Sequence, residues 1–332
     1  MKQKVIYPLL KLAVVSAALV WLSQRVDLAG VWRVLLEAKI GNLALAALFT
    51  SLPVFISGFR WRTLLGALGI DLPAGRLSLI CQIGQFFGVL VPGVAGDDGT
   101  RLLYISRLAP VRASQACSTV LLDRFIGFCC LFALSLVCIP LNWPLLSAQS
   151  STRAVGVGFL LAGSVVVAGC ALVFCLSRSQ LEKVVGFVRG RFPSSRIVEE
   201  WAAAADVFAR NKTTLLCVAG AALCTQILIC ATYWAVGTAV GIEVPLLAWT
   251  SFVPVIVLAG VLPITFAGIG VRDYLLFLFL GSSLNGGGDR LAALSLLLLG
   301  YTLCSALIGG VVYLFYQANP ESRVPSARSL VS

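Results

Sequence analysis

The chain has 332 residues, of which 59% are hydrophobic and 12% are charged. A soluble domain carries about twice this charged fraction, so the composition excludes a soluble globular protein and also a disordered or collagen-like chain. The formal net charge is +11, and the basic residues lie between long apolar runs. This pattern fits the positive-inside rule and anionic lipid headgroups, and we expect no nucleic-acid partner. The sequence predicts an all-α polytopic membrane protein.

The sequence lacks the residues and motifs that several classes of enzyme and metal site require. It contains no histidine, which excludes nucleophile pairs and zinc sites that need imidazole. The 11 cysteines lie mostly in apolar segments without a CxxC motif. We therefore expect them to act as small buried apolar residues and not as metal ligands. No Walker A loop, GxGxxG motif or Gly-x-Ser-x-Gly elbow occurs. We therefore expect no metal, no cofactor and no nucleotide hydrolysis by this chain alone.

Apolar segments divide residues 1–316 into the helices of a single membrane domain built from two repeat-like halves. A helix needs about 20 residues to span a bilayer, so two of the segments are short for a span. We expect about six or seven full transmembrane helices, the first of them retained because no cleavage site follows it. The connector 24–41 has apolar residues at helical spacing and is expected in the membrane interface. The segments are 5–23, 42–59, 77–92, 116–141, 154–177, 213–240, 244–262, 271–282 and 290–317, and the short ones are 77–92 and 271–282.

The polar stretch 178–212 carries seven basic residues against four acids, which places it in the cytoplasm by the positive-inside rule. Counting spans outward from this loop, segment 77–92 enters and leaves the membrane on the cytoplasmic side. The pair 244–262 and 271–282 does the same from the opposite side. The sequence thus predicts two re-entrant helical hairpins of inverted orientation. Both termini, including the polar tail 317–332, are expected on the cytoplasmic side of a bacterial inner membrane.

The two hairpin tips, near 92–101 and 263–272, resemble each other. In each tip an apolar helix ends at a proline, a loop with glycines follows, and an arginine opens the next helix nine residues after the proline. Two such spacings at hairpins that enter from opposite faces are the pattern of an inverted repeat. The residues are Pro92, Gly93, Gly96 and Arg101 in the first tip, and Pro263, Gly268, Gly270 and Arg272 in the second.

An arginine at the centre of a membrane helix costs roughly 3 kcal/mol or more, so Arg101 and Arg272 each need an anionic partner. A phosphate or carboxylate of a ligand fits this need, because arginine binds both in bidentate fashion. The alternative is an internal network, in which Arg101 pairs with Asp97 or Asp98, or in which pairing crosses the hairpins, as between Arg101 and Asp273 or between Asp123 and either arginine. Adjacent residues on a helix point apart, so pairs of neighbours in the sequence are not expected to neutralise each other. The acids are Asp97, Asp98, Asp123, which precedes Arg124, and Asp273.

Arg60-Trp61-Arg62 follows segment 42–59. Arginines and tryptophan at the cytoplasmic end of a helix are typical of an interfacial anchor with snorkelling side chains. Binding of a lipid headgroup by Arg60 and Arg62 is the alternative.

With these motifs, the sequence resembles the lysylphosphatidylglycerol synthase transmembrane-region family, also called the flippase-like domain. The resemblance spans nearly the whole chain, although the family usually has Glu where Asp123 and Asp273 stand and more glycine in the second tip loop. It implies translocation of a lipid or a lipid-linked headgroup between leaflets. Bifunctional relatives add a domain that aminoacylates lipid, whereas only a polar tail follows Tyr316 here, so a stand-alone member is expected. The matching pieces are Arg60-Trp61-Arg62, Phe86-Phe87 through Leu90-Val91-Pro92-Gly93 with Gly96-Asp97 to Arg101, Asp123-Arg124, and Pro263 through Gly268-Ile269-Gly270-Val271-Arg272-Asp273.

The leading hypothesis is a lipid flippase that is not an enzyme and that holds an anionic lipid by its phosphate between Arg101 and Arg272. A second hypothesis is a membrane enzyme acting on a polyprenyl phosphate or phospholipid, with Asp97, Asp98 or Asp123 as acid and base. A third is a non-transporting accessory subunit of an envelope enzyme. The sequence leaves open whether the chain forms a homo-oligomer.

Overall fold

A computed structural model of the chain describes residues 28–90, 95–147, 149–175, 207, 211–261, 270–281 and 288–318. All regular structure in these ranges is helical, and no strand occurs in them, which confirms the predicted all-α class. Several predicted features lie outside the described residues: helix 5–23, nearly all of loop 178–212, the tail from 319, and the tip residues Pro92, Gly93, Pro263 and Gly268.

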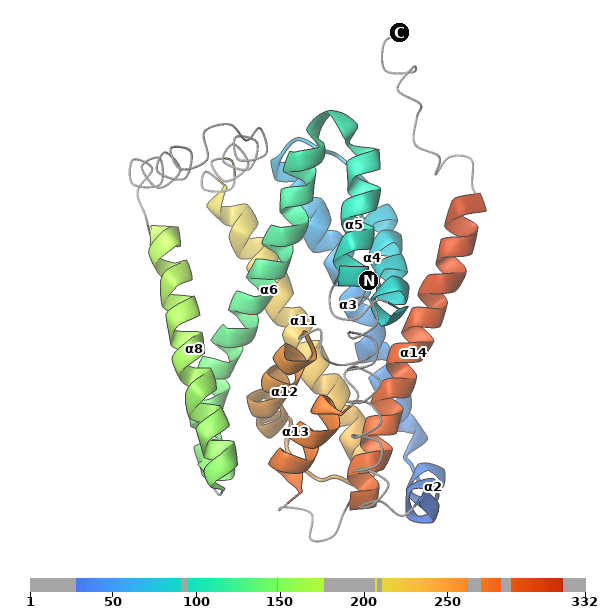
Figure 1. Cartoon of the computed structure of the whole chain (residues 1–332), viewed down its shortest axis with the longest axis vertical. Helices are drawn as coiled ribbons and strands as arrows, with labels where there is room; N and C mark the ends of the chain where they lie inside the picture. Colours follow the sequence, from blue (N-terminus) through green and yellow to red (C-terminus); the bar gives the residue numbers. More distant parts are fainter. Residues whose placement is uncertain are drawn as a thin grey trace, which may run out of the picture.

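Five helices in the described part of the chain are long and apolar enough to cross a membrane. They run at different tilts through the height of the molecule (Figure 1), and each overlaps a predicted apolar segment. The protein is therefore built as an integral membrane protein. The five are α3 (Ile40–Ala67), α6 (Ala113–Leu141, preceded by the 3₁₀ turn η1, Pro110–Arg112), α8 (Ser150–Cys175), α11 (Lys212–Ala239) and α14 (Gly288–Ala318).

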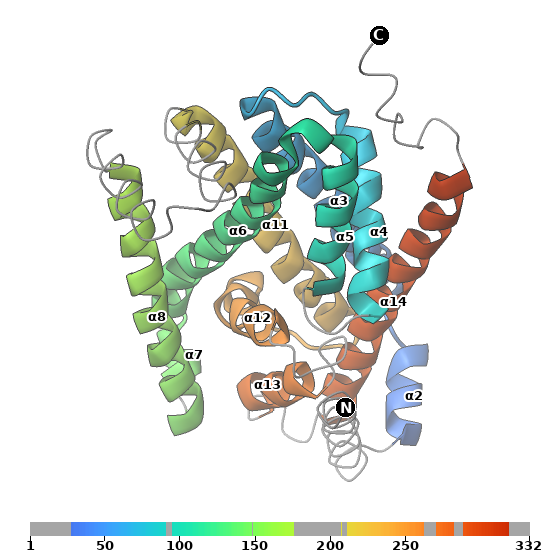
Figure 2. The same ribbon diagram turned by 45° about the horizontal axis from the view of Figure 1, so that its top comes forward.

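Four shorter helices form two hairpin-like pairs. The first pair is α4 (Ala74–Leu90) with α5 (Ala95–Leu108), and the second is α12 (Leu246–Val261) with α13 (Val271–Leu280). Within each pair the two helices pack against each other. In Figures 1 and 2, α4 and α5 lie in the upper half of the molecule, whereas α12 and α13 lie in the lower half. The two pairs thus occupy opposite ends of the same bundle.

The helix contacts follow a repeat of two four-helix units, α3–α6 and α11–α14. In each unit, helices that are consecutive in the chain pack against each other. Helices α3 and α11 pack along each other and join the two units. The units also exchange contacts, because α4 packs on α14 while α12 packs on α6. Each short pair is therefore held partly by the last helix of the other unit.

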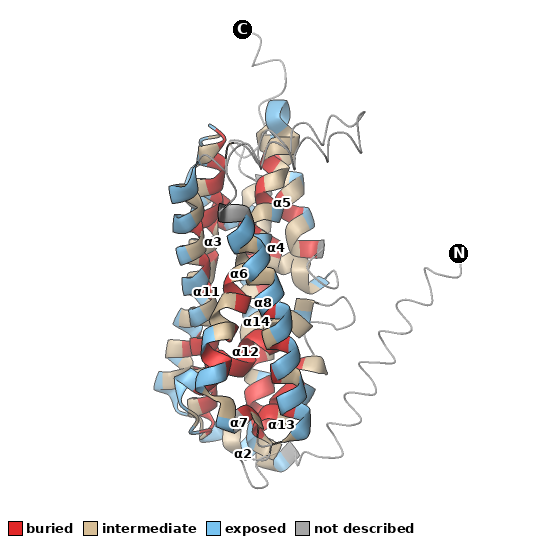
Figure 3. Ribbon diagram, turned by 90° about the vertical axis from the view of Figure 1, so that its left-hand side faces the viewer, coloured by how far each residue is buried: buried red, intermediate tan, exposed pale blue. Residues whose placement is uncertain are grey.

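A large apolar core lies where α6, α11, α12, α13 and α14 meet, and it includes the buried Trp249 and Phe252. The predicted interfacial connector contains helix α2 (Leu28–Leu36), which packs against α14. Val31 of α2 is buried in this core, so the connector is attached to the bundle by its apolar face. Figure 3 shows exposed residues on the outward faces of α3, α11 and α8 and buried residues inside. Apolar side chains on outward faces are expected where hydrocarbon is the solvent.

Candidate functional site

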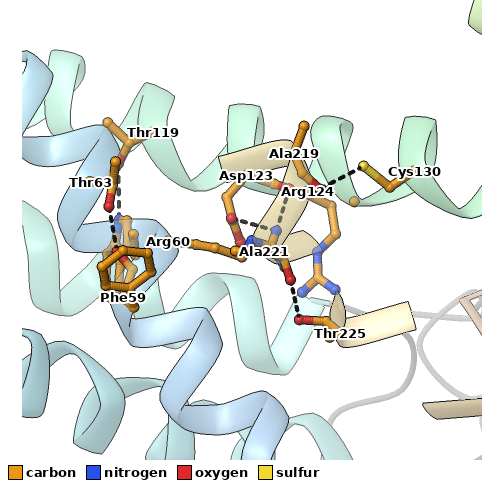
Figure 4. Close-up of polar contacts among 12 residues, drawn as sticks. Phe59, Arg60, Thr63, Thr119, Asp123, Arg124, Cys130, Ala219, Ala221 and Thr225 are labelled. Atoms are coloured by element: carbon orange, nitrogen blue, oxygen red, sulfur yellow. Dashed lines mark hydrogen bonds and ion pairs between the residues drawn. The ribbon is translucent and has the colours of Figure 1, made fainter. Parts of the chain in front are cut away.

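Arg60 lies inside the bundle, which corrects the prediction of a helix-end anchor. Helix α3 continues to Ala67, so Arg60 and Trp61 lie in its interior and both are buried. The Arg60 Nη2 atom is 2.5 Å from Asp123 Oδ1 and donates to the Asp123 carbonyl oxygen at 3.0 Å. Figure 4 shows Arg60 reaching from α3 to Asp123 on α6. Arg62 alone fits the anchor, since its side chain is 53% exposed and comes no closer than 3.9 Å to the Asp71 carboxylate.

Helix α5 contributes the second part of the site. Asp97 and Asp98 lie in its first turn, where the helix dipole stabilises negative charge. One turn later, Arg101 donates from Nε and Nη2 to the two carboxylate oxygens of Asp97, at 3.0 and 3.3 Å. The Nη1 atom of Arg101 also lies 3.7 Å from Asp123 Oδ2. Arg101 therefore connects the first turn of α5 to the carboxylate on α6 that holds Arg60.

Arg124 completes this group of charges from α6. Its Nη2 atom donates to Asp97 Oδ2 at 3.0 Å and to Asp98 Oδ1 at 2.5 Å, and its Nε donates to the same Asp98 oxygen at 3.2 Å. Asp97 is thus shared by Arg101 and Arg124. Among the described residues Arg124 pairs with Asp97 and Asp98 and its neighbour Asp123 pairs with Arg60 and Arg101, so these two neighbours do not neutralise each other, as expected for adjacent residues on a helix.

We call Arg60, Asp97, Asp98, Arg101, Asp123 and Arg124 the charge cluster. Three guanidinium groups and three carboxylates balance formally, which is the arrangement that burial of charge requires. The cluster is not uniformly buried. The side chains of Arg60 and Asp123 are 7% exposed, whereas that of Arg124 is 31% exposed. The charge cluster is therefore most exposed at the Arg124 end.

Close packing between α4 and α5 holds the cluster in place. A Cβ atom on Gly84 of α4 would collide with the Asp97 carboxylate, and one on Gly96 would collide with the backbone at Phe87 and Gly88. Small residues that let helix backbones approach closely are characteristic of membrane proteins. Gly84 and Gly88 were not among the predicted site residues, although their spacing of four is the sequence signal that could have identified them.

Arg272 belongs to a second group, at the start of α13. Its Nη2 atom donates to the Ser295 carbonyl at 3.1 Å and to the Ser295 hydroxyl at 3.0 Å. Asp273 accepts from that hydroxyl and, at 3.0 Å, from the backbone N–H of Gly270. Gly270 has a φ of 92°, a conformation that favours glycine. We call Arg272, Asp273 and Ser295 the Arg272 group.

One prediction about this second group is wrong. Arg272 and Asp273 were expected to point apart as neighbours on a helix, but Arg272 Nε lies 3.6 Å from Asp273 Oδ1. Helix α13 begins at Val271 with Gly270 as its N-cap. Asp273 accepts from the Gly270 backbone N–H, which places its carboxylate at the helix start within reach of the long Arg272 side chain. Arg272 Nε is nevertheless buried without a hydrogen-bond partner among the described residues.

The two predicted arginines differ in their local setting. Arg272 is the second residue of α13, as expected for an arginine that opens a helix. Arg101 instead lies six residues after α5 begins at Ala95, so the prediction that it opens its helix is wrong. Their hydrogen-bond and ion-pair partners in the described part of the chain do not overlap. Internal pairing, the alternative to ligand contact, is present at both arginines in this conformation.

No group of three or more His, Cys, Asp or Glu side chains that could hold a metal ion occurs within the described ranges. The charged donors of the charge cluster and of the Arg272 group are guanidinium groups, a type of donor that in general matches phosphate or carboxylate. Ser295 was missed at the sequence level, because a single serine in an apolar helix carries no distinguishing pattern.

A helical bundle with apolar outward faces, two short helix pairs and balanced charges inside defines a polytopic integral membrane protein. Residues 9–318 match the family described as lysylphosphatidylglycerol synthase TM region. The chain belongs to this family, which confirms the resemblance seen at the level of motifs. A comparison with curated proteins finds no match. Family membership is compatible with a lipid-related role in the membrane.

Proposed function

We propose that this protein is a lipid flippase, which moves an anionic phospholipid or a lipid-linked headgroup between leaflets and is not an enzyme. The observation that carries the proposal is the charge cluster, in which guanidinium groups suited to phosphate lie inside a bundle of membrane-spanning helices. All three of its carboxylates contact arginines. Carboxylates paired in this way serve as counter-ions rather than as general bases, which favours transport over catalysis.

The proposed topology makes the two short pairs re-entrant from opposite faces. Helix α4 has 17 residues and α12 has 16, fewer than a span needs, and the two pairs lie in opposite halves of the bundle (Figure 2). Chain breaks at such a depth are tolerated where they line a cavity or are buried in protein. We place the end of the bundle that carries loop 178–212 in the cytoplasm of a bacterial inner membrane, together with both termini.

Phosphate binding is proposed to begin at Arg124, the most accessible arginine of the charge cluster. Arg124 is the only arginine that contacts Asp98 among the described residues, whereas Asp97 and Asp123 are each shared by two arginines. A phosphate that replaces Asp98 on Arg124 therefore disrupts a single ion pair. Arg272, whose Nε has no hydrogen-bond partner among the described residues and lies 3.6 Å from Asp273 Oδ1, is proposed to receive the phosphate on the side of the second hairpin.

The partners implied by this proposal are anionic lipids, with the acyl chains remaining in the bilayer while the headgroup crosses. A homo-oligomer or an envelope enzyme that supplies the lipid is compatible with the same site.

The test is a flip assay in sealed proteoliposomes that contain a headgroup-labelled anionic phospholipid. Arg124→Ala is expected to abolish protein-dependent movement of the label, and Arg124→Lys to retain part of it, because lysine binds phosphate only as a point charge. Arg62→Ala is the matched control, since Arg62 is an exposed arginine outside the cluster, and it should transport normally. Full transport by Arg124→Ala would refute the proposed entry site, and absence of transport by the unmodified protein would refute the flippase.

A further inference from the structure

The first short pair is attached to the last helix of the other unit by an amide–hydroxyl contact. Gln82 Nε2 on α4 donates to the carbonyl oxygen of Ser305 on α14 at 2.7 Å and to its hydroxyl at 3.3 Å. The Ser305 hydroxyl in turn donates to Gln85 Oε1 at 2.5 Å. Two side chains of α4, one turn apart, thus hold one serine of α14.

The second short pair is attached to the other unit in an equivalent way. Asn142 Nδ2, directly after the end of α6, donates to the hydroxyl of Ser251 on α12 at 2.7 Å. It also donates to the carbonyl oxygen of Leu247 at 3.0 Å. The Ser251 hydroxyl donates to the Cys138 carbonyl oxygen of α6 at 2.9 Å. Both interfaces between a short pair and the other unit, α4 with α14 and α12 with α6, therefore combine a carboxamide with a serine.

Close packing resists sliding at the first of these interfaces. A Cβ atom on Gly309 of α14 would collide with the carbonyl oxygen of Gln82, and one on Gly310 would lie 3.0 Å from the Phe86 ring. At the second interface Ser251 is buried. Hydrogen bonds in such apolar surroundings are costly to leave unmade. Separating either interface therefore requires both helices to lose packing and polar contacts together.

Each of these last helices also contacts the short pair of its own unit. On α14, Ser295 accepts from Arg272 of α13. On α6, Asp123 and Arg124 pair with Arg101 and Asp97 of α5. Figure 1 shows α14 running alongside both pairs, next to α13 at its lower end and next to α4 above. Helices α6 and α14 thus connect the two short pairs through polar contacts at both ends.

We propose that Ser305 and Ser251 are positioning residues that couple the two short pairs mechanically. Loss of the Ser305 hydroxyl loosens the contact between α4 and α14 and, through α14, the contact of Ser295 with α13. Loss of the Ser251 contact acts in the reverse direction through α6. The charge cluster and the Arg272 group are therefore expected to change their geometry together. This coupling is a property of the free protein and does not depend on which ligand the protein carries.

The experiment is hydrogen exchange by mass spectrometry on the full chain in lipid nanodiscs, without ligand. Ser305→Ala is expected to raise exchange in peptides from α4–α5 and also in peptides from α12–α13, by about fivefold for the directly contacted helix. Ser251→Ala should raise exchange in both pairs as well. Thr302→Ala is the control on α14, because within the described ranges the Thr302 hydroxyl bonds only to the Leu298 carbonyl of its own helix, and it should leave both pairs unchanged.

Increases confined to the pair that each serine touches would overturn the coupling, and so would an absence of any increase. If Ser305→Ala does not yield folded protein, Gln85→Met removes the acceptor of the Ser305 hydroxyl while keeping a similar side-chain volume, and the same two outcomes apply. A failed flip assay leaves this result intact, because exchange is measured without substrate. The two proposals can thus fail independently.

Discussion

The carboxylate of Asp97 lies directly against the α-carbon of Gly84, where no side chain could be accommodated without displacing it. Helix α4, which contributes no charge to the cluster, thus packs against the Asp97 carboxylate that Arg101 and Arg124 share. The geometry of the charge cluster depends on α4 as well as on the helices that carry its members.

Gly84→Ala is expected to lower the free energy of unfolding by about 1–3 kcal/mol, the usual cost of forcing a methyl group into a packed site. The measurement is thermal unfolding of detergent-purified protein. In an Asp97→Ala background the same substitution should cost clearly less, because the colliding carboxylate is gone. Gly66→Ala on α3, where nothing lies within 4 Å, is the control. An equal cost of Gly84→Ala in both backgrounds would contradict the role assigned to Asp97.

Asp123→Ala should destabilise the protein by about 3–5 kcal/mol, because it leaves Arg60 without its ion-pair partner in a buried position. Thermal unfolding with a size-exclusion assay of monodispersity measures this loss. Asp71→Ala removes an acid whose side chain is 92% exposed and 3.9 Å from its arginine, so no measurable change is expected there. Equal losses of stability in the two variants would show that the buried Arg60–Asp123 pair contributes no more to folding than an exposed acid.

Trp61→Phe tests the link between α3 and α6. It keeps an aromatic ring but removes the Nε1–H group that donates to Thr119 Oγ1 at 2.9 Å, and a loss of about 1 kcal/mol is expected. Thr119→Val should cost a similar amount, and the double variant should cost less than the sum. Trp32→Phe, at a 64% exposed position, should be neutral. Additive losses would argue that the hydrogen bond contributes nothing.

Gly270→Ala should destabilise the start of α13 by about 1–3 kcal/mol, since an alanine is strained at a φ of 92°. The effect should appear as faster hydrogen exchange in α13 together with a lower unfolding temperature. Gly260→Ala, in the preceding helix with nothing within 4 Å, serves for comparison. An unchanged exchange rate in α13 would show that Gly270 is not needed for the turn that Asp273 caps.

One contact of the site, that between Asp97 and Arg101, is predictable because it follows from local spacing. Asp97 and Arg101 are four residues apart, so a helix over this segment brings them onto one face. The pairing of Arg60 with Asp123 could not be predicted in this way, because 63 residues separate them. In a membrane protein the lipid-facing and protein-facing sides of a helix are both apolar, so hydrophobic periodicity does not reveal which face of α3 meets α6.

The misplaced end of α3 has a related cause. The predicted segment 42–59 ends just before Arg60 because a charged residue normally marks the limit of an apolar run. The backbone continues as helix to Ala67, since a partner on another helix compensates the charge. A hydropathy pattern shows the charge of Arg60 but not its partner Asp123 on another helix. The predicted helix was therefore too short at this end.

The amino-acid sequence by itself determined the class of this protein. Its apolar segments are long enough to span a bilayer, its polar breaks are few, and backbone groups in hydrocarbon must be satisfied within helices. Only the tertiary structure decided which charges meet: Arg101 with Asp97 and Asp123, and Arg272 with Ser295. The physical reason is that a buried charge is stabilised by whichever opposite group the packing brings within reach, and that packing depends on glycines and serines far apart in the chain.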